Sequence, residues 1–374
     1  MDGHQDGQLP FPVDHVQGIL QVAYLLRNGR FIWFYTWHTL GNWHLLYTRH
    51  RVILQKNQLT KMSQIQKPVI LVAGAAGLQG GAVIKALLAK GNVAIRAIVR
   101  DKNSEAAQAL AAKNIELFET TFDDLAGLTK AAQGATGGFS VQMGTHPGNK
   151  GEETRHATNL VAAAKAAGVQ QFVHTSVARA GEHESFVDWD KGRWEPLYWQ
   201  EKAAAIDAVK AAGFPYWTIL KPPFLMENLL PPRDAGMFPT MAQGKFITPL
   251  APDTKIDWLS GQDIGRFAAA AFAQPEKFNQ KELSIVGAKV TMAEVAAALS
   301  AVTGKRFEAI SLNEQEAAAT GLFEYGVETY AWQNVEGYKI DPQQAAGYGI
   351  QPESLEAFLE GHKAFLQARY AGLA

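Results

Sequence analysis

The feature that most constrains the fold of this chain is a set of three evenly spaced glycines between an apolar segment and a helical pattern. They stand three residues apart in VAGAAGLQG, at Gly74, Gly77 and Gly80. The apolar run at 68–73 predicts a strand before them, and the apolar spacing over 80–91 predicts a helix after them. Such glycines let a pyrophosphate approach the backbone, where the helix N-terminus offers free N–H groups and partial positive charge. The alternative is that they only shape a strand-to-helix turn.

Short apolar strands and helical patterns alternate along the chain after this turn. Strands are predicted at 68–73, 93–100, 115–120, 137–142, 171–176 and 216–221. Helices are predicted between them at 80–91, 103–113, 123–134, 152–168 and 197–213. This alternation indicates a parallel sheet with both faces covered. The right-handed crossover rule then gives an α/β fold, a doubly wound parallel sheet of the Rossmann type.

The pattern changes at 221–236, where two proline pairs indicate irregular chain that leaves the sheet. Beyond this segment, helices are predicted at 261–274, 291–304 and 352–370, and strands at 281–287 and 306–311. We therefore expect a Rossmann domain over 62–225 and a smaller α/β substrate domain over 226–374. The helix at 261–274 is a candidate to return to the Rossmann sheet.

The composition argues against several classes of function. With 35 Lys and Arg against 36 Asp and Glu, the net charge of −1 predicts no nucleic-acid partner and no attraction to acidic lipids. The chain has no cysteine, which excludes disulfides, thiolate catalysis and cysteine-bound zinc. This usage suits a reducing compartment, and we expect a cytoplasmic protein without a metal.

Residues 1–61 differ from the rest of the chain. They hold three of the nine tryptophans and no acidic residue between His15 and Lys61. The uncharged run at 31–48 is about as long as a membrane span, but its histidines, asparagine and glycine make it a poor one. Met62 reads as the natural start of a domain whose first strand follows within a few residues. We therefore expect an N-terminal extension outside the folded core, in preference to a membrane anchor.

The end of the second predicted strand indicates which nucleotide the glycine turn would bind. An NAD-binding unit places Asp or Glu about 20 residues after the glycines, where it binds the ribose 2′-hydroxyl. Here the strand ends in IVRDK, which puts Arg100 in that place and Lys102 close behind it. A guanidinium pairs with a 2′-phosphate, so we expect NADP(H), with Lys102 assisting. The alternative is that Arg100 is a solvated charge at a strand end.

These segments together resemble the short-chain dehydrogenase/reductase superfamily, and in particular its atypical NmrA-like branch. The resemblance rests on VAGAAGLQGGAV, RAIVRD, QFVHTS, GFPYWTILKPPFLMEN and SGQDIGRFAAAAF, in this order, and covers the chain from Lys67 onward. It implies a Rossmann domain, NADP(H) as cofactor and the reduction of a carbonyl, a quinone or an activated double bond. Carried over by position, the cofactor contacts fall on Gly74, Gly77, Leu78, Gln79, Gly80 and Arg100.

The chain departs from the superfamily pattern in two places. The Gly-Asp pair beside the adenine is here Thr120-Thr121, so Thr121, with Phe122 after it, brings no charge to the adenine side. The turn after the fourth strand, which usually contains Asn, reads SVQMG and offers Gln142 instead.

The resemblance also implies a catalytic set. The superfamily uses a Ser after the fifth strand and a Tyr-x-x-x-Lys pair on the next helix, matched here by Ser176, Tyr198 and Lys202. Residues four apart share one helix face, and a cation beside a phenol lowers its pKa, which would make Tyr198 a general acid. Lys202 would also hold the nicotinamide ribose, and Ser176 the substrate oxygen. Alternatively, Tyr198 is a core or rim residue, because NmrA-like members commonly keep the lysine and vary the tyrosine. Lys202 could likewise be only a surface charge.

The segment after the sixth predicted strand supplies the remaining candidates. Pro223 and Phe224 are expected to form a wall beside the nicotinamide, and Asn228 and Met226 to face the substrate; the alternative is an apolar chain exit. The long, charged loop at 178–196 is predicted to be a lid.

Two functions remain open from the sequence. One is an NADPH-dependent oxidoreductase that transfers hydride to a small carbonyl, quinone or enone. The other is an NADP(H)-binding regulator or redox sensor with little catalysis, whose nucleotide state changes its contacts with a protein partner. Either can form oligomers.

Overall fold

The computed structural model describes residues 67–144 and 148–373, together with the backbone of three strands between residues 21 and 48. The chain forms two compact units, Met1–Gln66 and Lys67–Ala374. In the first unit, β1 (Gln21–Arg27), β2 (Arg30–Thr39) and β3 (Asn42–Thr48) pair antiparallel in the order β1-β2-β3. The sequence pattern did not predict this sheet. The rest of the expected extension lies outside the described residues.

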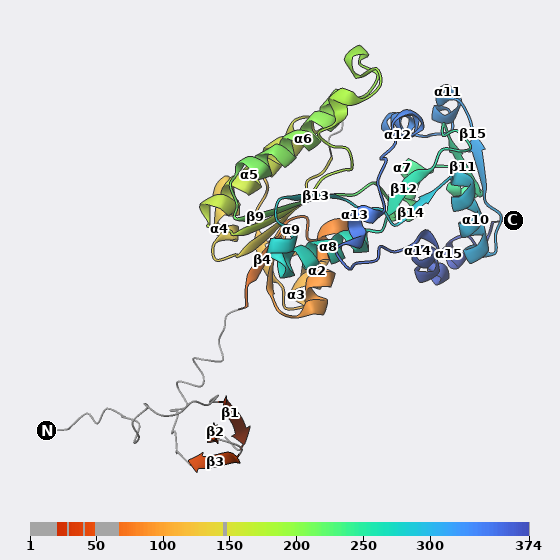
Figure 1. Cartoon of the computed structure of the whole chain (residues 1–374). Helices are drawn as coiled ribbons and strands as arrows, with labels where there is room; N and C mark the ends of the chain where they lie inside the picture. Colours follow the sequence, from red (N-terminus) through yellow and green to blue (C-terminus); the bar gives the residue numbers. More distant parts are fainter. Residues whose placement is uncertain (1–20, 28–29, 40–41, 49–66, 145–147, 374) are drawn as a thin grey trace. The chain divides into compact units, whose positions relative to one another are not determined.

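Seven strands build the central sheet of the second unit, in the order β13-β9-β8-β7-β4-β5-β6, and every pair is parallel (Figure 1). The strands are β4 (Val69–Val72), β5 (Ala94–Val99), β6 (Glu116–Glu119), β7 (Gly137–Ser140), β8 (Gln171–Thr175), β9 (Tyr216–Lys221) and β13 (Lys281–Ser284). This order confirms the doubly wound Rossmann-type fold. The sheet contains β13 in addition to the six strands predicted between 68 and 221. The strand order reverses between β4 and β7, which is where such folds bind ligands.

Helices cover both faces of the sheet (Figure 1). One layer holds α4 (Leu125–Ala132), α5 (Glu152–Ala166) and α6 (Pro196–Ala211), and the other α2 (Leu78–Lys90), α3 (Glu105–Ala111), α8 (Gly261–Ala273) and α9 (Pro275–Phe278). Local sequence starts these helices: the Ser104 and Asp124 side chains cap α3 and α4, and Pro196 opens α6. Helices α2 and α8 touch closely at Gly265, where a side chain would collide with the Ala82 carbonyl.

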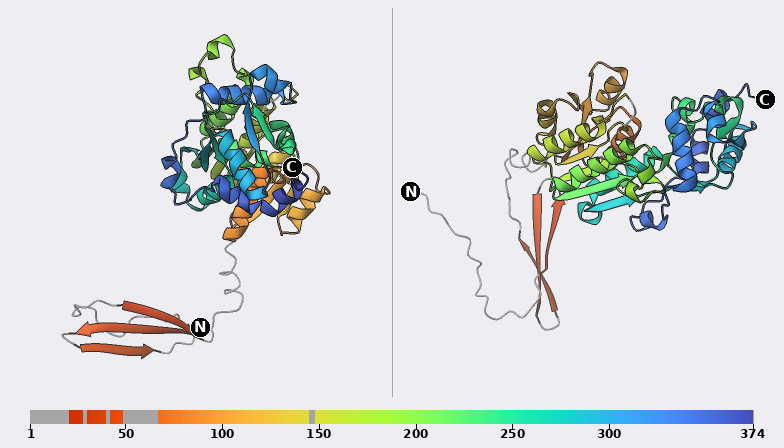
Figure 2. Two further views of the ribbon diagram at one scale, coloured as in Figure 1. Left: turned by 90° about the vertical axis from the view of Figure 1, so that its right-hand side faces the viewer. Right: turned by 90° about the horizontal axis from the view of Figure 1, so that it is seen from above.

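The chain after β9 adds a second, smaller group of elements at one end of the sheet, seen in green to blue in Figures 1 and 2. Its strands are β10 (Phe224–Leu225), β12 (Ile256–Leu259) and β14 (Ala288–Val290) in one sheet and β11 (Lys245–Thr248) and β15 (Glu308–Ser311) in another. Its helices are α7 (Asp234–Met237), α10 (Met292–Thr303), α11 (Glu314–Ala318), α12 (Glu324–Val335), α14 (Leu355–Gly361) and α15 (Lys363–Arg369). Helix α13 (Gln343–Ala346) instead lies beside β13 of the central sheet (Figure 1). The single terminal helix expected at 352–370 is two helices, divided at His362.

Four short 3₁₀ helices complete the described elements: η1 (His183–Ser185), η2 (Trp189–Lys191), η3 (Met226–Leu229) and η4 (Met241–Gln243). The proposed domain boundary at residue 225 remains a prediction, because the whole of Lys67–Ala374 is one compact unit. Within it, α8 packs against α2, and β13 joins the edge of the sheet at β9.

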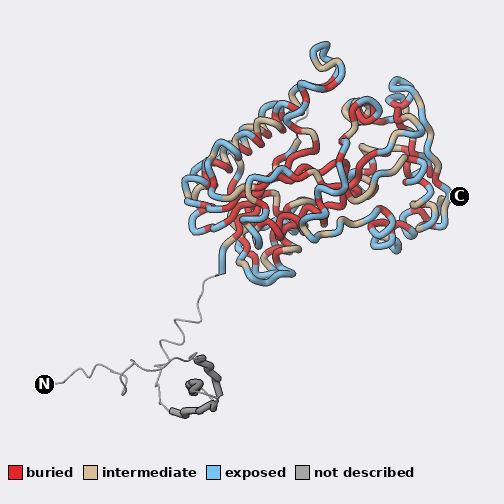
Figure 3. Tube along the Cα trace, viewed as in Figure 1, coloured by how far each residue is buried: buried red, intermediate tan, exposed pale blue. Residues whose placement is uncertain are grey.

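The hydrophobic core follows the central sheet, as the buried trace in Figure 3 shows. Successive strand residues alternate between the two faces, so Phe172 and Val173 of β8 enter different core clusters. The smaller group contributes an aromatic cluster around Phe224, Phe238 and Trp258. This cluster is continuous with the core on the Phe172 face of the sheet, so the smaller group packs onto the sheet through a shared core.

Candidate functional site

The glycine turn forms a cradle at the carboxyl end of β4. Gly74 adopts a positive φ of 60°, and the Gly77 N–H donates to its carbonyl at 2.9 Å. A side chain on Gly80 would collide with that carbonyl, so only glycine allows α2 to start this close to the turn. Helix α2 begins at Leu78, and no side chain of the described residues caps it. The first N–H groups of α2 therefore have no side-chain acceptor among the described residues, which is compatible with the predicted phosphate site.

Gln79, in the first turn of α2, is tied to the neighbouring sheet. The Thr175 hydroxyl at the end of β8 donates to Gln79 Oε1 at 2.8 Å. Leu78 packs toward the start of α8, where a side chain on Gly261 would lie 3.0 Å from Leu78 Cγ. Both residues predicted from the family pattern therefore lie in the cradle, and Gln79 also fixes its orientation.

Arg100 follows β5 and is exposed. Within the part of the chain that the structure describes, its guanidinium makes neither a side-chain hydrogen bond nor an ion pair. Arg96 of the same strand, in contrast, pairs with Glu116 at 2.8 Å. Lys102 is also exposed, and its backbone N–H donates to Glu119 at 2.9 Å. The structure thus leaves Arg100 available for an anion, such as a 2′-phosphate.

The candidates on the adenine side follow β6 and β7. Thr121 is exposed and Phe122 half-buried, with its ring centre 5.4 Å from that of His156 on α5. Gln142 is buried, and its Nε2 donates to Ser140 Oγ at 3.0 Å. The Gln142 amide is therefore directed to the end of β7.

Tyr198 and Lys202 lie on one face of α6, with the ammonium 5.6 Å from the centre of the phenol ring. Lys202 Nζ donates to Glu153 Oε1 of α5 at 2.5 Å, and both side chains of this pair are buried. The sequence analysis missed Glu153. Its place in the first turn of a helix carries no motif, since acidic residues favour that position in any helix.

The Glu153–Lys202 pair changes the electrostatics expected at Tyr198. Burial raises the pKa of the Tyr198 phenol above its ordinary value, and the Glu153 carboxylate raises it further. The expectation that the pKa of Tyr198 is lowered is therefore wrong, mainly because the phenol is buried. Tyr198 is a protonated phenol at neutral pH and can donate a hydrogen bond.

Two buried side chains at the end of β8 are incompletely hydrogen-bonded. Ser176 Oγ has no partner among the described residues, although its backbone N–H donates to the Leu220 carbonyl at 2.9 Å. His174, which the sequence analysis missed, has Nδ1 at 3.1 Å from Ser140 Oγ, and its Nε2 has no partner in the same part of the chain. Burial, with a contribution from Lys202, lowers the pKa of His174 to about 3, so the imidazole is neutral. Buried polar atoms without partners are rare and indicate a ligand or water.

The predicted wall and substrate residues after β9 divide into two groups. The Phe224 ring is buried, with its centre 4.8 Å from that of Trp258, and Met226 is fully buried. Pro223 is also buried. Asn228 is half-buried, and its amide has no hydrogen bond to any described residue. Of this segment, Asn228 therefore keeps a polar group that can contact a ligand.

The loop at 178–196 is anchored to the smaller group of elements. Glu336, which ends α12, accepts hydrogen bonds from Arg179 and from the Val187 N–H, both at 2.7 Å. Glu328 accepts the Glu195 N–H at 2.5 Å, and Trp194 of the loop is buried. These contacts indicate a fixed wall and argue against the predicted lid.

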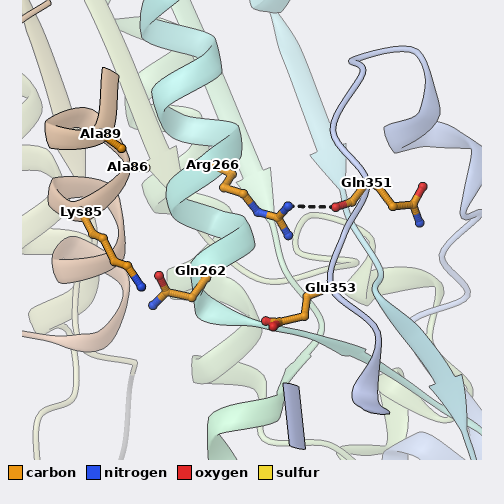
Figure 4. Close-up of a pocket in the computed structure, with 7 residues that line it drawn as sticks. All are labelled: Lys85, Ala86, Ala89, Gln262, Arg266, Gln351 and Glu353. Atoms are coloured by element: carbon orange, nitrogen blue, oxygen red, sulfur yellow. Dashed lines mark hydrogen bonds between the residues drawn. The ribbon is translucent and has the colours of Figure 1, made fainter. Parts of the chain in front are cut away.

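A separate pocket lies between α2, α8 and the segment before α14, as the close-up in Figure 4 shows. Its polar lining includes Lys85, Gln262 and Arg266, whose guanidinium donates to the Gln351 carbonyl at 3.0 Å. None of the residues predicted for cofactor or substrate lines it.

Comparison with known proteins connects this geometry to a family. Residues 66–345 match the model of the NmrA-like family. An NAD(P)H azoreductase of Xenophilus azovorans is 31% identical over 257 residues, which are 68% of this chain and 81% of that protein. No helix within the described residues has the length and apolar character that a membrane span requires.

Two solved structures share the fold. The NADPH-dependent quinone oxidoreductase of Escherichia coli, complexed with NADPH, aligns with a TM-score of 0.62 at 24% identity over 78% of this chain and 99% of its own. The negative transcriptional regulator NmrA, in complex with NADP, aligns with a TM-score of 0.59 at 19% identity over 81% of this chain and 97% of its own.

Proposed function

We propose that this chain, which belongs to the NmrA-like family, is an NADPH-dependent oxidoreductase that reduces a small quinone, carbonyl or enone. The observation that carries the proposal is the buried Ser176 hydroxyl without a described partner, at the carboxyl end of a strand in a sheet that also forms a phosphate cradle. A hydroxyl in this situation is stabilised when a ligand oxygen accepts its hydrogen bond.

The residues of the cradle fit NADP(H). The glycine turn leaves no room for side chains at Gly74 and Gly80, where a pyrophosphate would approach the backbone. The exposed guanidinium of Arg100, without a described ion pair, fits a 2′-phosphate. Bound NADPH would supply a hydride to the acceptor. Thr121 and Phe122 remain candidates for the adenine side, with Lys102 beside the phosphate.

The catalytic roles fall to three side chains near the end of β8. Ser176 and Tyr198 would donate hydrogen bonds to the acceptor oxygen, on which negative charge develops during reduction. Lys202 Nζ has three N–H groups and gives one to Glu153, so the others can hold the nicotinamide ribose. In this scheme Tyr198 acts as a hydrogen-bond donor, and a water molecule would supply the proton that the reduced oxygen takes up.

The class of acceptor is supported by the names of relatives. An NAD(P)H azoreductase and a quinone oxidoreductase are among the similar proteins. The quinone is therefore the first acceptor to test.

The experiment is NADPH oxidation by the full chain across a panel of quinones, aldehydes and enones, with Ser176→Ala measured beside the wild type. We expect turnover with at least one quinone, and a fall of about 10–100-fold in kcat for the variant. Thr129→Ala, which removes a hydroxyl bonded to its own helix on α4, is the matched control and should keep full activity. No turnover with any acceptor, despite tight NADPH binding, would contradict the proposal.

A regulator that binds NADP(H) is the second candidate. It is favoured by the raised pKa of Tyr198, which leaves this phenol a weak acid, and by the likeness to a transcriptional regulator complexed with NADP. This function predicts NADPH binding without turnover, so the same panel separates the two candidates.

A further inference from the structure

The first turn of α5 is bound by two adjacent residues of α6. The Glu201 carboxylate accepts the N–H groups of Gly151, Glu153 and Thr154, at 2.5, 3.0 and 3.3 Å. Glu201 therefore caps the N-terminus of α5 from a neighbouring helix. The backbone N–H groups of α5 satisfy its buried carboxylate without a cation. Lys202, the next residue, is left to pair with Glu153.

The pair is enclosed. Glu153 is 1% exposed and Lys202 8% exposed. The capping bonds hold the Glu153 backbone, and the ion pair holds its side chain, so the position of the Lys202 ammonium is set by α5 as well as by its own helix. A Cβ atom added to Gly144, in the turn after β7, would lie 3.7 Å from Tyr198 Cε2 and 3.8 Å from Lys202 Nζ. This turn therefore borders both side chains.

Within 67–144 and 148–373, the titratable groups around Tyr198 come from four segments. Glu153 belongs to α5, and Lys202 and Glu201 to α6. His174 belongs to β8 and is uncharged at neutral pH, while Tyr338 follows α12. Lys202 and Glu153 are thus the charges that act most directly on the phenol, and they have opposite effects on its ionisation.

We propose that Glu153 is a positioning residue, which fixes the Lys202 ammonium beside Tyr198 and compensates its charge at the phenol. The meaning of this arrangement for catalysis rests on the proposed oxidoreductase function. The electrostatic effect of Glu153 on Tyr198 does not rest on that function, and it can be measured without cofactor or acceptor.

The test is an alkaline titration of the full chain, in which phenolate formation is followed by ultraviolet absorbance. Glu153→Gln removes the compensating charge and keeps the shape. We expect Tyr198 of this variant to ionise at a pH about one to three units below the pH at which it ionises in the wild type. The signal should vanish when Tyr198→Phe is added. It should shrink when Lys202→Met is added, because the uncompensated ammonium is then no longer present and only the loss of the Glu153 carboxylate remains.

Glu152→Gln is the matched control. Glu152 precedes Glu153 in the same turn, and its nearest cation is Arg155 at 3.9 Å on an exposed face. This variant should leave the titration unchanged. A folded Glu153→Gln protein in which Tyr198 ionises as in the wild type would overturn the proposal, as would a shift that is equally large without Lys202.

Thermal unfolding covers the case in which Glu153→Gln does not fold. Each single change, Glu153→Gln or Lys202→Met, removes one charge of this buried pair and leaves the other, whereas the double variant removes both. We expect the double variant to unfold at a higher temperature than either single variant. If the losses simply add, the two residues do not act as a pair and the proposal fails. Absence of NADPH oxidation with an intact titration signal would instead count against the proposed function alone.

Discussion

The Thr175 hydroxyl donates a hydrogen bond to Gln79 Oε1 at 2.8 Å, which joins the end of β8 to the first turn of α2. These residues stand 96 positions apart in the sequence. The bond links the strand that leads to Ser176 with the helix start that forms the cradle. It therefore couples the expected nucleotide site to the expected reduction site.

This bond gives the first prediction. Thr175→Val keeps the shape and removes the donor, so we expect a loss of about 1 kcal/mol in the free energy of unfolding. NADPH affinity should fall about threefold to tenfold, because the first turn of α2 loses its anchor. Fluorescence titration of NADPH measures the affinity, with Thr129→Val as a control that should bind as the wild type does. Unchanged affinity and stability in Thr175→Val would refute the anchoring role.

Gly80 gives the second prediction. A methyl group there would collide with the Gly74 carbonyl, so Gly80→Ala should displace the start of α2. We expect a loss of about 1–3 kcal/mol in stability and weaker NADPH binding. Gly361→Ala, in α14, where a side chain would meet nothing within 4 Å, is the control for the same change. Calorimetry measures the stability and a nucleotide titration the NADPH affinity. A Gly80→Ala protein with wild-type stability and affinity would show that the close approach of α2 to the Gly74 carbonyl is not required.

Arg100 gives the third prediction. If its guanidinium binds the 2′-phosphate, Arg100→Ala should weaken NADPH binding about 10–100-fold and leave NADH binding nearly unchanged. Arg306→Ala, with a side chain 84% exposed and distant in sequence, controls for the loss of a surface charge. Equal losses for the two nucleotides would exclude a role in phosphate recognition.

His174 gives the fourth prediction, on the pH dependence of stability. Its pKa is lowered by burial, and further by Lys202, to about 3 in the folded chain, against 6.5 for a free side chain. Between these values the unfolded chain binds a proton that the folded chain does not, so this residue lowers stability as the pH falls. The slope is at most about 1.4 kcal/mol per pH unit.

His174→Gln should remove that slope. Chemical unfolding of both proteins from about pH 7 to about pH 5 measures it, within the window that the two pKa values define. We expect the stability of the wild type to fall more steeply than that of the variant. Parallel pH curves would mean that His174 is not buried in its neutral form.

The sequence was sufficient for features determined by neighbouring residues. The apolar runs and helical spacing from Val69 to Lys221 predicted each strand of the first six and the helices between them, because local periodicity decides them. The edge strand β13 was predicted as a strand but not as part of the sheet, since its pairing with β9 is a long-range contact. The separate sheet of β1 to β3 was not predicted, because the aromatic residues of that segment are also compatible with an extension or a membrane anchor.

The candidate site was predicted in outline and not in its electrostatics. Tyr198 and Lys202 share a face because helix geometry requires it, but Glu153 lies 49 residues from Lys202 and only the packing of α5 on α6 brings them together. Phe224 and Met226 are apolar in either interpretation, so their place in the core was open until the fold was known. Ser176 matched the family pattern, whereas its lack of a described partner is a property of the packed structure.

The most direct test of the central claim is rapid mixing of the NADPH-bound protein with a soluble quinone, followed by the loss of NADPH absorbance in a single turnover. We expect the wild type to oxidise its bound NADPH, and Ser176→Ala to do so more slowly while binding the nucleotide equally well. NADPH that stays bound and unoxidised with every quinone tested, in a folded wild-type protein, would contradict it.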